Sequence, residues 1–184
     1  MRIIAGEWRG RVLKAPPGAT TRPTGDRTRE ALFSMLISRL GALDDLAVVD
    51  VFAGSGALGL EAMSRGAASC IFIDQDREAI RAIRANIEML GANAEVLPIA
   101  VSAIGPARKA CDLLMFDPPY GSGGAGALLE KMTRLGWATD SAWAAIETRN
   151  DEAVSAEGWG LEVERTYGIA KLSVLSRIAP AQPD

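Results

Sequence analysis

Histidine is absent from this 184-residue chain, and cysteine occurs only twice. Without histidine, the protein cannot build a Ser-His-Asp triad, a Cys-His pair or a histidine-ligated metal site. Cys70 and Cys111 each open an apolar run, which is typical of reduced thiols in a core rather than of a disulfide or a metal site. We therefore expect no metal, and chemistry that uses carboxylates, backbone groups or a cofactor.

Long apolar runs are also missing. No stretch approaches the roughly 18 to 20 uninterrupted apolar residues that span a bilayer, and the amino terminus MRIIAGEWRG lacks the apolar segment of a signal peptide. We expect a soluble cytoplasmic monomer with no membrane partner. With 48% hydrophobic and 23% charged residues, the chain can bury a sizeable core as one domain, 1–184.

The net charge of −3 hides an asymmetry along the chain. Residues 1–29 carry a balance of +5, which leaves −8 for residues 30–184. Such a basic arm on an acidic body is a candidate contact for a polyanion, although a basic run can also be a solvated surface. The basic residues of this arm are Arg2, Arg9, Arg11, Lys14, Arg22, Arg27 and Arg29.

From residue 46 onward, short apolar runs alternate with helical patterns. The patterns predict strands at 46–52, 69–74, 94–100, 111–117 and 142–148, and helices at 56–66, 76–91 and 125–135. An earlier helix is predicted from a cap at Asp26 to a stop at Gly41. Residues 2–15 predict a hairpin, and 161–178 predict an antiparallel strand pair around Gly168.

This alternation predicts a doubly wound α/β, Rossmann-like domain. The sheet should be mostly parallel and covered on both faces, with an antiparallel carboxyl-terminal pair and an amino-terminal β-hairpin extension. We assign residues 1–25 to the hairpin and loop extension, 26–178 to the core and 179–184 to a frayed tail. Ligands of such sheets bind beyond the carboxyl ends of the strands, so the strand ends are the candidate site.

The first two strands end in groups suited to a nucleoside cofactor. Gly54, Gly56 and Gly59 form a G-x-G-x-x-G between strand and helix, a pattern that a nicotinamide enzyme would share. Asp50 at the strand edge suits a positively charged ligand better than a pyrophosphate. Asp74 lies twenty residues after Gly54, the spacing of an acid that binds ribose hydroxyls, while Asp76 is expected to cap the next helix.

The fourth strand ends in FDPPYG. Two prolines hold Asp117 and Pro118 in an extended conformation past the sheet edge, and neither proline donates an N–H. The Asp117 carboxylate and the Pro118 carbonyl are then two acceptors suited to an amino group, with Tyr120 as a stacking surface. The alternative is a strand terminator followed by a Pro-Pro turn.

The two motifs DVFAGSGALG and DPPY together resemble motifs I and IV of class I S-adenosylmethionine-dependent methyltransferases that act on exocyclic amino nitrogens. More closely, the chain resembles the RsmD family, which methylates a guanine N2 of bacterial 16S ribosomal RNA. The segments that carry this resemblance run in order through residues 1 to about 177: RIIAGEWRGRVLKAPPG, RPTGDRTREALFSML, FAGSGALGLEAMSRGA, DPPYG and the GW at 136–137.

The resemblance implies a role for each matching position. Asp50, Phe52, Gly54 and Gly56 would hold the methionine part of S-adenosylmethionine, Asp74 its ribose, and Arg29 and Glu30 would support the cofactor side. Asp117, Pro118 and Tyr120 would hold the target base, with Pro119 fixing the turn. RNA phosphates would contact Arg2, Arg9, Arg11, Lys14, Arg22 and Arg27. The resemblance also implies S-adenosylhomocysteine as product and the small ribosomal subunit, or its assembly intermediate, as partner.

One position departs from the family pattern. At the end of the third strand the family usually places an Asp or Asn that can receive the adenine amino group, and this chain has Ala100. Recognition of the adenine is then expected from the backbone near Val101 or from Ser102.

Several alternatives remain at this point. DNA adenine N6, DNA cytosine N4 and protein glutamine methyltransferases share the fourth-strand motif, although the basic arm favours RNA. An NAD(P)-dependent oxidoreductase would explain the glycines and Asp74 but has no use for DPPY. A non-catalytic RNA-binding assembly factor would be expected to have lost the cofactor loop, which is intact here apart from Ala100.

Overall fold

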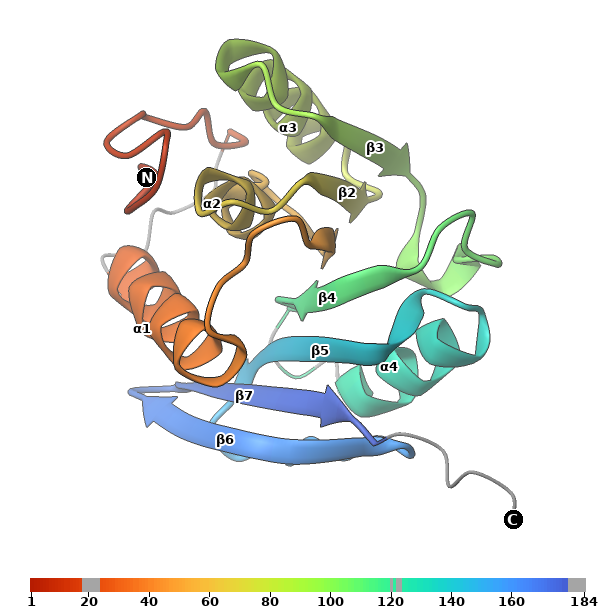
Figure 1. Ribbon diagram of the computed structural model, residues 1–184. Coiled ribbons are helices and arrows are strands. Elements are labelled where there is room, and N and C mark those ends of the chain that lie inside the picture. The colour runs from red at the N-terminus through yellow and green to blue at the C-terminus, as the bar shows by residue number, and fades with distance from the viewer. Residues whose placement is uncertain (18–23, 120, 122–123, 179–184) are drawn as a thin grey trace.

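A seven-stranded sheet forms the centre of the computed structural model, which describes residues 1–17, 24–119, 121 and 124–178. The strand order is β3-β2-β1-β4-β5-β7-β6 (Figure 1). Strands β1 to β5 are parallel, and β7 runs antiparallel between β5 and β6. The strands are β1 Ala47–Val51, β2 Ser69–Asp74, β3 Ala94–Pro98, β4 Cys111–Phe116, β5 Ala138–Arg149, β6 Trp159–Tyr167 and β7 Ala170–Arg177. The predicted doubly wound α/β sheet with an antiparallel end is confirmed.

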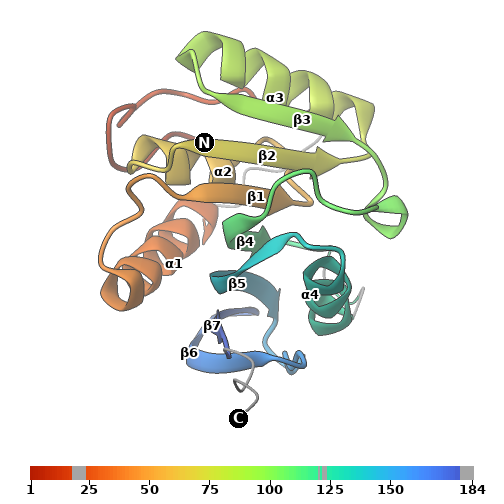
Figure 2. The same ribbon diagram turned by 45° about the vertical axis from the view of Figure 1, so that its right-hand side comes forward.

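Helices cover both faces of the sheet. Helices α1 (Thr24–Leu40), α2 (Ala57–Ser64) and α3 (Arg77–Leu90) lie on one face, and α4 (Ala125–Arg134) lies on the other (Figure 2). Because side chains alternate along a strand, each strand contributes to two cores. Val48 packs with Phe33 and Leu60 on the first face, whereas the adjacent Val49 packs with Leu129 on the second.

Helix α3 begins and ends as its sequence predicts. The Asp76 carboxylate accepts hydrogen bonds from the N–H groups of Glu78 (2.8 Å) and Ala79 (2.9 Å), and Gly91 ends the helix with a left-handed backbone. The prediction for α1 was wrong at its start. That helix begins at Thr24, so Asp26 lies in its first turn, where the carboxylate contacts Arg29 at 3.0 Å.

The predicted amino-terminal hairpin is present only as a hairpin-like turn with one antiparallel bridge, Arg2 to Val12. The hydrogen bonds between its arms stop after a few residues, because the N–H groups of Ile4 and Ala5 bind the Glu61 carboxylate of α2. The N–H of Glu7 likewise donates to the α2 backbone. These residues therefore pair with a helix instead of a strand.

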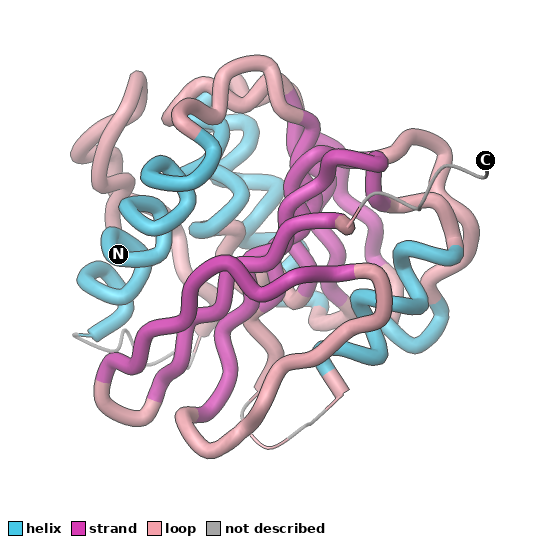
Figure 3. Tube along the Cα trace, turned by 60° about the horizontal axis from the view of Figure 1, so that its bottom comes forward, coloured by secondary structure: helices cyan, strands magenta, loops and turns pink. Residues whose placement is uncertain are grey.

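The carboxyl-terminal pair, β6 and β7, forms a long hairpin at one end of the sheet (Figure 3). Strand β5 starts earlier than the predicted 142–148, and a register shift between Cys111 and Leu113 interrupts its pairing with β4. In the part of the chain that the structure describes, no helix has both the length and the apolar character that crossing a membrane requires.

Both cysteines are free and buried, as predicted. Burial raises the pKa of the Cys111 thiol to about 12 and the pKa of the Cys70 thiol well above its ordinary value. Neither thiol is therefore a ready nucleophile at neutral pH.

Candidate active site

A cavity of about 1180 Å³ lies beyond the carboxyl ends of the five parallel strands. It is bounded on its other sides by the start of α1, by Met1 and by the turn between β6 and β7. The predicted site residues that line it are Arg29, Asp50, Phe52, Gly54, Asp74, Val101, Asp117, Pro118 and Pro119. Of the remaining predictions, Gly56 and Glu30 do not line the cavity, and Tyr120 lies outside the described residues.

The loop after β1 folds back over β2. Phe52 has a φ of 64°, a left-handed backbone that costs a residue with a side chain roughly 1–2 kcal/mol. The N–H groups of Phe52 and Ala53 both donate to the Ile73 carbonyl at 3.1 Å. The N–H of Gly54 then donates to the Asp74 carboxylate at 2.8 Å. Asp74 thus shapes the glycine loop as well as lining the cavity.

Gly56 supports this loop from behind. It caps α2 with a φ of 77°, and a Cβ at this position would lie 3.3 Å from the Phe72 ring and 3.4 Å from Ile83. This close approach explains why glycine is needed there. A direct contact of Gly56 with a cofactor remains a prediction.

Only one of the two carboxylate oxygens of Asp50 has a hydrogen-bond partner in the described part of the protein. The residue is only 1% exposed, and one oxygen accepts the Gly59 N–H of α2 at 2.9 Å. The other oxygen, Oδ1, has no hydrogen-bond partner within the described part of the protein. Burial raises the pKa of Asp50 well above its ordinary value, and the nearby Asp117 and Asp74 carboxylates add to this increase. A buried, unpaired acceptor at a cavity wall fits a cationic group such as an ammonium.

The end of β4 brings Asp117, Pro118 and Pro119 to the same cavity. The N–H of Asp117 still donates to the Val51 carbonyl, at 3.4 Å, so the chain remains extended beside β1 at this point. The Asp117 side chain is exposed at the cavity, whereas Pro118 is buried. The strand end therefore brings Asp117 and Pro118 to the cavity wall, and their role as acceptors for an amino group stays a prediction.

The end of β3 leads into a single 3₁₀ turn, η1 (Val101–Ala103), and Ala100, Val101 and Ser102 all line the cavity. The Lys131 ammonium of α4 donates to the Ser102 carbonyl at 2.8 Å, which fixes the turn against that helix. The first N–H groups of such a turn have no partner inside it, so backbone donors are available where an acidic side chain is missing.

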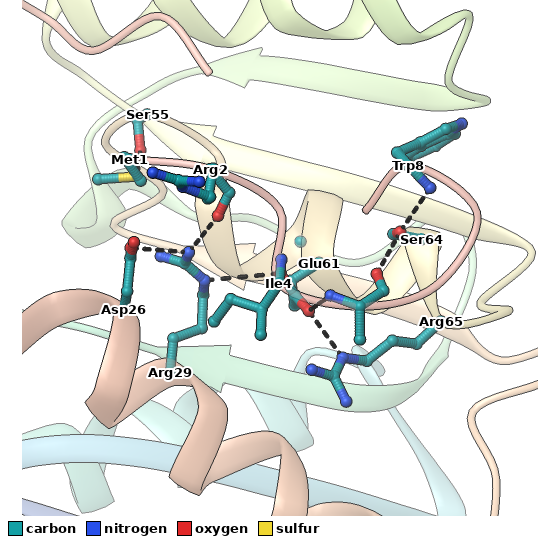
Figure 4. Close-up of polar contacts among 12 residues, drawn as sticks. Met1, Arg2, Ile4, Trp8, Asp26, Arg29, Ser55, Glu61, Ser64 and Arg65 are labelled. Atoms are coloured by element: carbon teal, nitrogen blue, oxygen red, sulfur yellow. Dashed lines mark hydrogen bonds and ion pairs between the residues drawn. The ribbon is translucent and has the colours of Figure 1, made fainter. Parts of the chain in front are cut away.

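Glu61 of α2 connects the amino-terminal segment to Arg29 (Figure 4), and Arg29 lines the cavity. Its carboxylate is fully buried and accepts the N–H groups of Ile4 (2.8 Å) and Ala5 (3.0 Å). It also pairs with Arg65 at 2.8 Å and with Arg29 at 3.7 Å. Glu61 was not predicted from the sequence, although an acid inside the apolar run GALGLEAMS is a signal of a buried, paired charge.

Arg29 carries the same network toward the cavity. Its guanidinium donates to the Arg2 carbonyl and to Asp26, as Figure 4 shows. Beside it, the Ser55 hydroxyl of the glycine loop donates to the Met1 sulfur at 3.2 Å. The amino-terminal segment is thus attached directly to the loop that would hold a cofactor.

Asn86 of α3 makes a second connection of the same kind. Its buried side-chain amide donates to the carbonyls of Lys14 (2.9 Å) and Ser55 (3.0 Å), and its oxygen accepts the Lys14 N–H at 2.8 Å. One side chain therefore holds both the amino-terminal arm and the glycine loop.

The basic residues predicted to contact RNA lie mainly on the surface. Arg2, Arg9, Arg11, Lys14 and Arg27 are at least partly exposed, and Arg22 lies outside the described residues. Among the described residues, no group of three or more Cys, Asp or Glu side chains is placed to hold a metal ion.

Comparison with known proteins identifies the family. Residues 1–176 match the family described as Conserved hypothetical protein 95. The chain is 35% identical to ribosomal RNA small subunit methyltransferase D of Escherichia coli K12, over all of this chain and 93% of that protein. It is 32% identical to the protein of the same name from Haemophilus influenzae, over 92% of this chain and 90% of that protein.

Solved structures agree with this result. The yhhF protein of Escherichia coli is similar with a TM-score of 0.83 at 37% identity, over 98% of this chain and 99% of that one. The ribosomal protein L11 methylase of Lactobacillus delbrueckii, at 16% identity and a TM-score of 0.67, shares the fold over 91% of this chain and 86% of that one. The fold is that of the class I methyltransferases, and the chain belongs to the Conserved hypothetical protein 95 family, the RsmD family that its motifs resemble.

Proposed function

We propose that this protein transfers a methyl group from S-adenosylmethionine to the exocyclic N2 of a guanine in 16S ribosomal RNA. The observation that carries the proposal is that one cavity joins two sets of groups. These are a glycine loop with Asp50 and Asp74, and the Asp117-Pro118 acceptors. The names of the Escherichia coli and Haemophilus influenzae relatives support ribosomal RNA of the small subunit as the substrate.

S-adenosylmethionine, when bound, supplies an electrophilic methyl group on a sulfonium sulfur. Asp50 Oδ1 is suited to accept from the ammonium of its methionine part, because this oxygen is buried and unpaired at the cavity wall. Asp74 is suited to accept from the ribose hydroxyls through its remaining lone pairs. The backbone near Val101 and Ser102 is the proposed contact for the adenine, since Ala100 offers no polar side chain.

Asp117 and Pro118 would hold and aim the target amino group. The lone pair of a guanine N2 is delocalised into the ring, so the amino group is a poor nucleophile. Hydrogen bonds from its two N–H groups to the Asp117 carboxylate and the Pro118 carbonyl would localise electron density on nitrogen and orient it for in-line attack. In such a transfer the N–C bond would form as the S–C bond breaks toward sulfur, and the surplus proton would leave N2 for Asp117 or solvent.

The target base has to leave its stack or loop to reach this position. Tyr120 is the proposed new stacking partner for the base, and its ring lies outside the described residues. No covalent enzyme intermediate is needed, which suits a chain with no histidine and two buried cysteines. We also propose that the enzyme acts as a cytoplasmic monomer on the assembled small subunit or its assembly intermediate.

Two measurements test the proposal. S-adenosylhomocysteine should raise the melting temperature of the protein, whereas NADH should leave it unchanged; stabilisation by NADH alone would support an oxidoreductase instead. The protein should then transfer label from S-adenosylmethionine to 16S RNA in small subunits from cells that lack the modification. Labelling of DNA or of a protein glutamine, with unlabelled 16S RNA, would contradict the proposed substrate.

A further inference from the structure

Glu147 lies near the carboxyl end of β5 and lines the cavity together with Asp117. Strands β4 and β5 are parallel, with Met115 opposite Ala145 and Phe116 opposite Ile146. Met115 and Ala145 pack in the same core, on the face covered by α1 to α3. Side chains two residues apart on an extended chain lie on the same face, so Asp117 and Glu147 lie on the face of Met115 and Ala145. Both line the cavity, on backbones about 4.8 Å apart.

This arrangement places a second carboxylate beside the acceptors proposed for the amino group. Glu147 is half-buried, and its partner in the β7 register, Leu172, is fully buried in the same core. The backbone at Glu147 is therefore held by β7, and the preceding residue, Ile146, pairs with β4. A rigid strand positions a recognition group more accurately than a loop does.

The chemistry of the two carboxylates selects among bases. In guanine, the ring atom next to the amino group on the Watson–Crick side is N1, which also bears a hydrogen, so N2 and N1 are two adjacent donors. The atom next to the amino group is an acceptor in adenine (N1), in cytosine (N3) and in a glutamine side chain (the amide oxygen). An ionised carboxylate accepts hydrogen bonds and cannot donate them. It can therefore bind the N1–H of guanine, whereas it would face an acceptor in adenine, cytosine or glutamine.

We propose that Glu147 is the residue that makes the site specific for guanine, by accepting the N1–H while Asp117 and Pro118 hold N2. This assignment rests on the proposed function and extends it to the choice of base. A base with an acceptor at N1 would bring its lone pair against the Glu147 carboxylate, so this contact would be repulsive and the base N1 would lack a donor. A site built to hydrogen-bond one group rejects analogues that lack it by large factors.

The test uses 2,6-diaminopurine, which keeps the N2 amino group and has an acceptor at N1. Small subunits are assembled from 16S transcripts that carry either guanine or 2,6-diaminopurine at the methylated position, and kcat/KM is measured for each. The wild-type protein should prefer guanine by about 100-fold or more. Glu147→Gln should reduce this preference to a few-fold, because its amide can donate to the diaminopurine N1.

Two further variants make the result decisive. Glu162→Gln changes an exposed glutamate on β6 that accepts the Ser176 hydroxyl, and it should keep the wild-type preference. Glu147→Asp keeps an acceptor-only side chain, so it should react more slowly with the preference retained. S-adenosylhomocysteine should stabilise all variants as it does the wild type.

The assignment is overturned if Glu147→Gln keeps the preference for guanine, or if it slows both substrates equally, as a purely structural residue would. It is also overturned if Glu147→Asp loses the preference. These outcomes differ from failure of the proposed function, in which the wild-type protein itself makes no N2-methylguanosine.

Discussion

At the scale of single residues, Asp50 is the side chain with the most unusual surroundings. One of its oxygens is held by the Gly59 N–H, and the other is buried at the cavity wall without a partner in the described structure. Burial raises the pKa of Asp50 in the folded protein. At a pH between the unfolded and the folded pKa values, the folded protein therefore keeps a proton on Asp50 that the unfolded chain releases. Without a cofactor, this group therefore makes the stability of the protein dependent on pH.

The raised pKa of Asp50 sets the sign of this dependence. Below the ordinary Asp pKa of 3.8 both the folded and the unfolded chain are protonated, and the contribution of Asp50 to stability is fully present. That contribution is lost as the pH rises toward and through the raised pKa of the folded state, at about 1.4 kcal/mol for each pH unit that separates the two pKa values. Asp50→Asn keeps an acceptor for Gly59 and cannot ionise. Its melting temperature relative to wild type should therefore increase between pH 4.5 and pH 8.

Thermal unfolding of both proteins across this pH range measures the effect. In the same experiment at pH 8, S-adenosylhomocysteine should stabilise wild type more than Asp50→Asn, because only the carboxylate can pair with its ammonium. A difference in melting temperature that does not change with pH would contradict the account of Asp50.

Asp117 is the residue on which we expect methyl transfer to depend most. Asp117→Ala removes one of the two acceptors for the amino group, and we expect kcat to fall by roughly 100-fold or more. Because Asp117 is proposed to hold the base and not the cofactor, S-adenosylhomocysteine should still stabilise the variant. Single-turnover methylation and thermal shift measure the two effects. Activity within a few-fold of wild type would remove Asp117 from the mechanism.

The residues that could be predicted from the sequence are those that close the early strands. Asp50, Asp74 and Asp117 each follow an apolar run, and all three line the cavity. Glu147 also follows an apolar run, near the end of the fifth strand, and the same rule applied there would have found it. Glu61 is different, because the two backbone N–H groups that it accepts lie 56 and 57 residues away in the chain and no local pattern indicates them.

At the scale of elements, the amino-terminal segment and α2 form one unit. Glu61 satisfies two backbone N–H groups of the segment and pairs with two arginines, while Ser64 binds Ala5 and Trp8. A Cβ on Gly6 would overlap the Ser64 carbonyl oxygen, so the segment approaches the helix as closely as the backbone allows. The hairpin prediction missed this unit because strand patterns do not describe pairing with a helix.

Glu61→Gln should loosen this unit. The change leaves Arg29 and Arg65 without a buried countercharge, and we expect a loss of about 3 kcal/mol in the free energy of unfolding. Hydrogen exchange of the Ile4 and Ala5 amides should become faster, while the amides of β4 change little beyond the global effect. Denaturant unfolding and exchange mass spectrometry measure these quantities.

Glu78→Gln is the matched control for this prediction. It breaks an exposed ion pair with Arg81 on α3, and such pairs contribute less than about 1 kcal/mol. If Glu61→Gln were no more destabilising than Glu78→Gln, the role of Glu61 in holding the segment would be wrong.

At the scale of the whole molecule, charge is arranged around the cavity. The basic segment of the chain lies against the wall that holds the glycine loop, and the remainder of the protein is acidic. RNA bound to the basic side would therefore be directed to the cavity, while the acidic body would repel it elsewhere. The sheet order and helix layers could be predicted from apolar periodicity. The position of the arm could not, because buried polar contacts determine it.

Arg9 and Arg11 are both exposed on this arm, and their replacement tests its role. Each phosphate contact contributes about 0.7 to 0.9 to the slope of log K against log salt. The double variant Arg9→Ala, Arg11→Ala should therefore weaken RNA binding and reduce the slope by roughly 1.5. Arg108→Ala with Arg134→Ala, on the α4 side, should leave the slope unchanged. If the two double variants changed the RNA affinity and the salt slope equally, RNA would not bind preferentially to the arm.

The central claim is that one cavity holds both S-adenosylmethionine and the N2 of a guanine. The most direct measurement supplies the protein with methyl-labelled S-adenosylmethionine and small subunits that lack the modification, digests the 16S RNA and identifies the labelled nucleoside. The account predicts N2-methylguanosine at a single position with the wild-type protein and none with Asp117→Ala. N6-methyladenosine, or unlabelled RNA from a protein that binds S-adenosylhomocysteine, would contradict it.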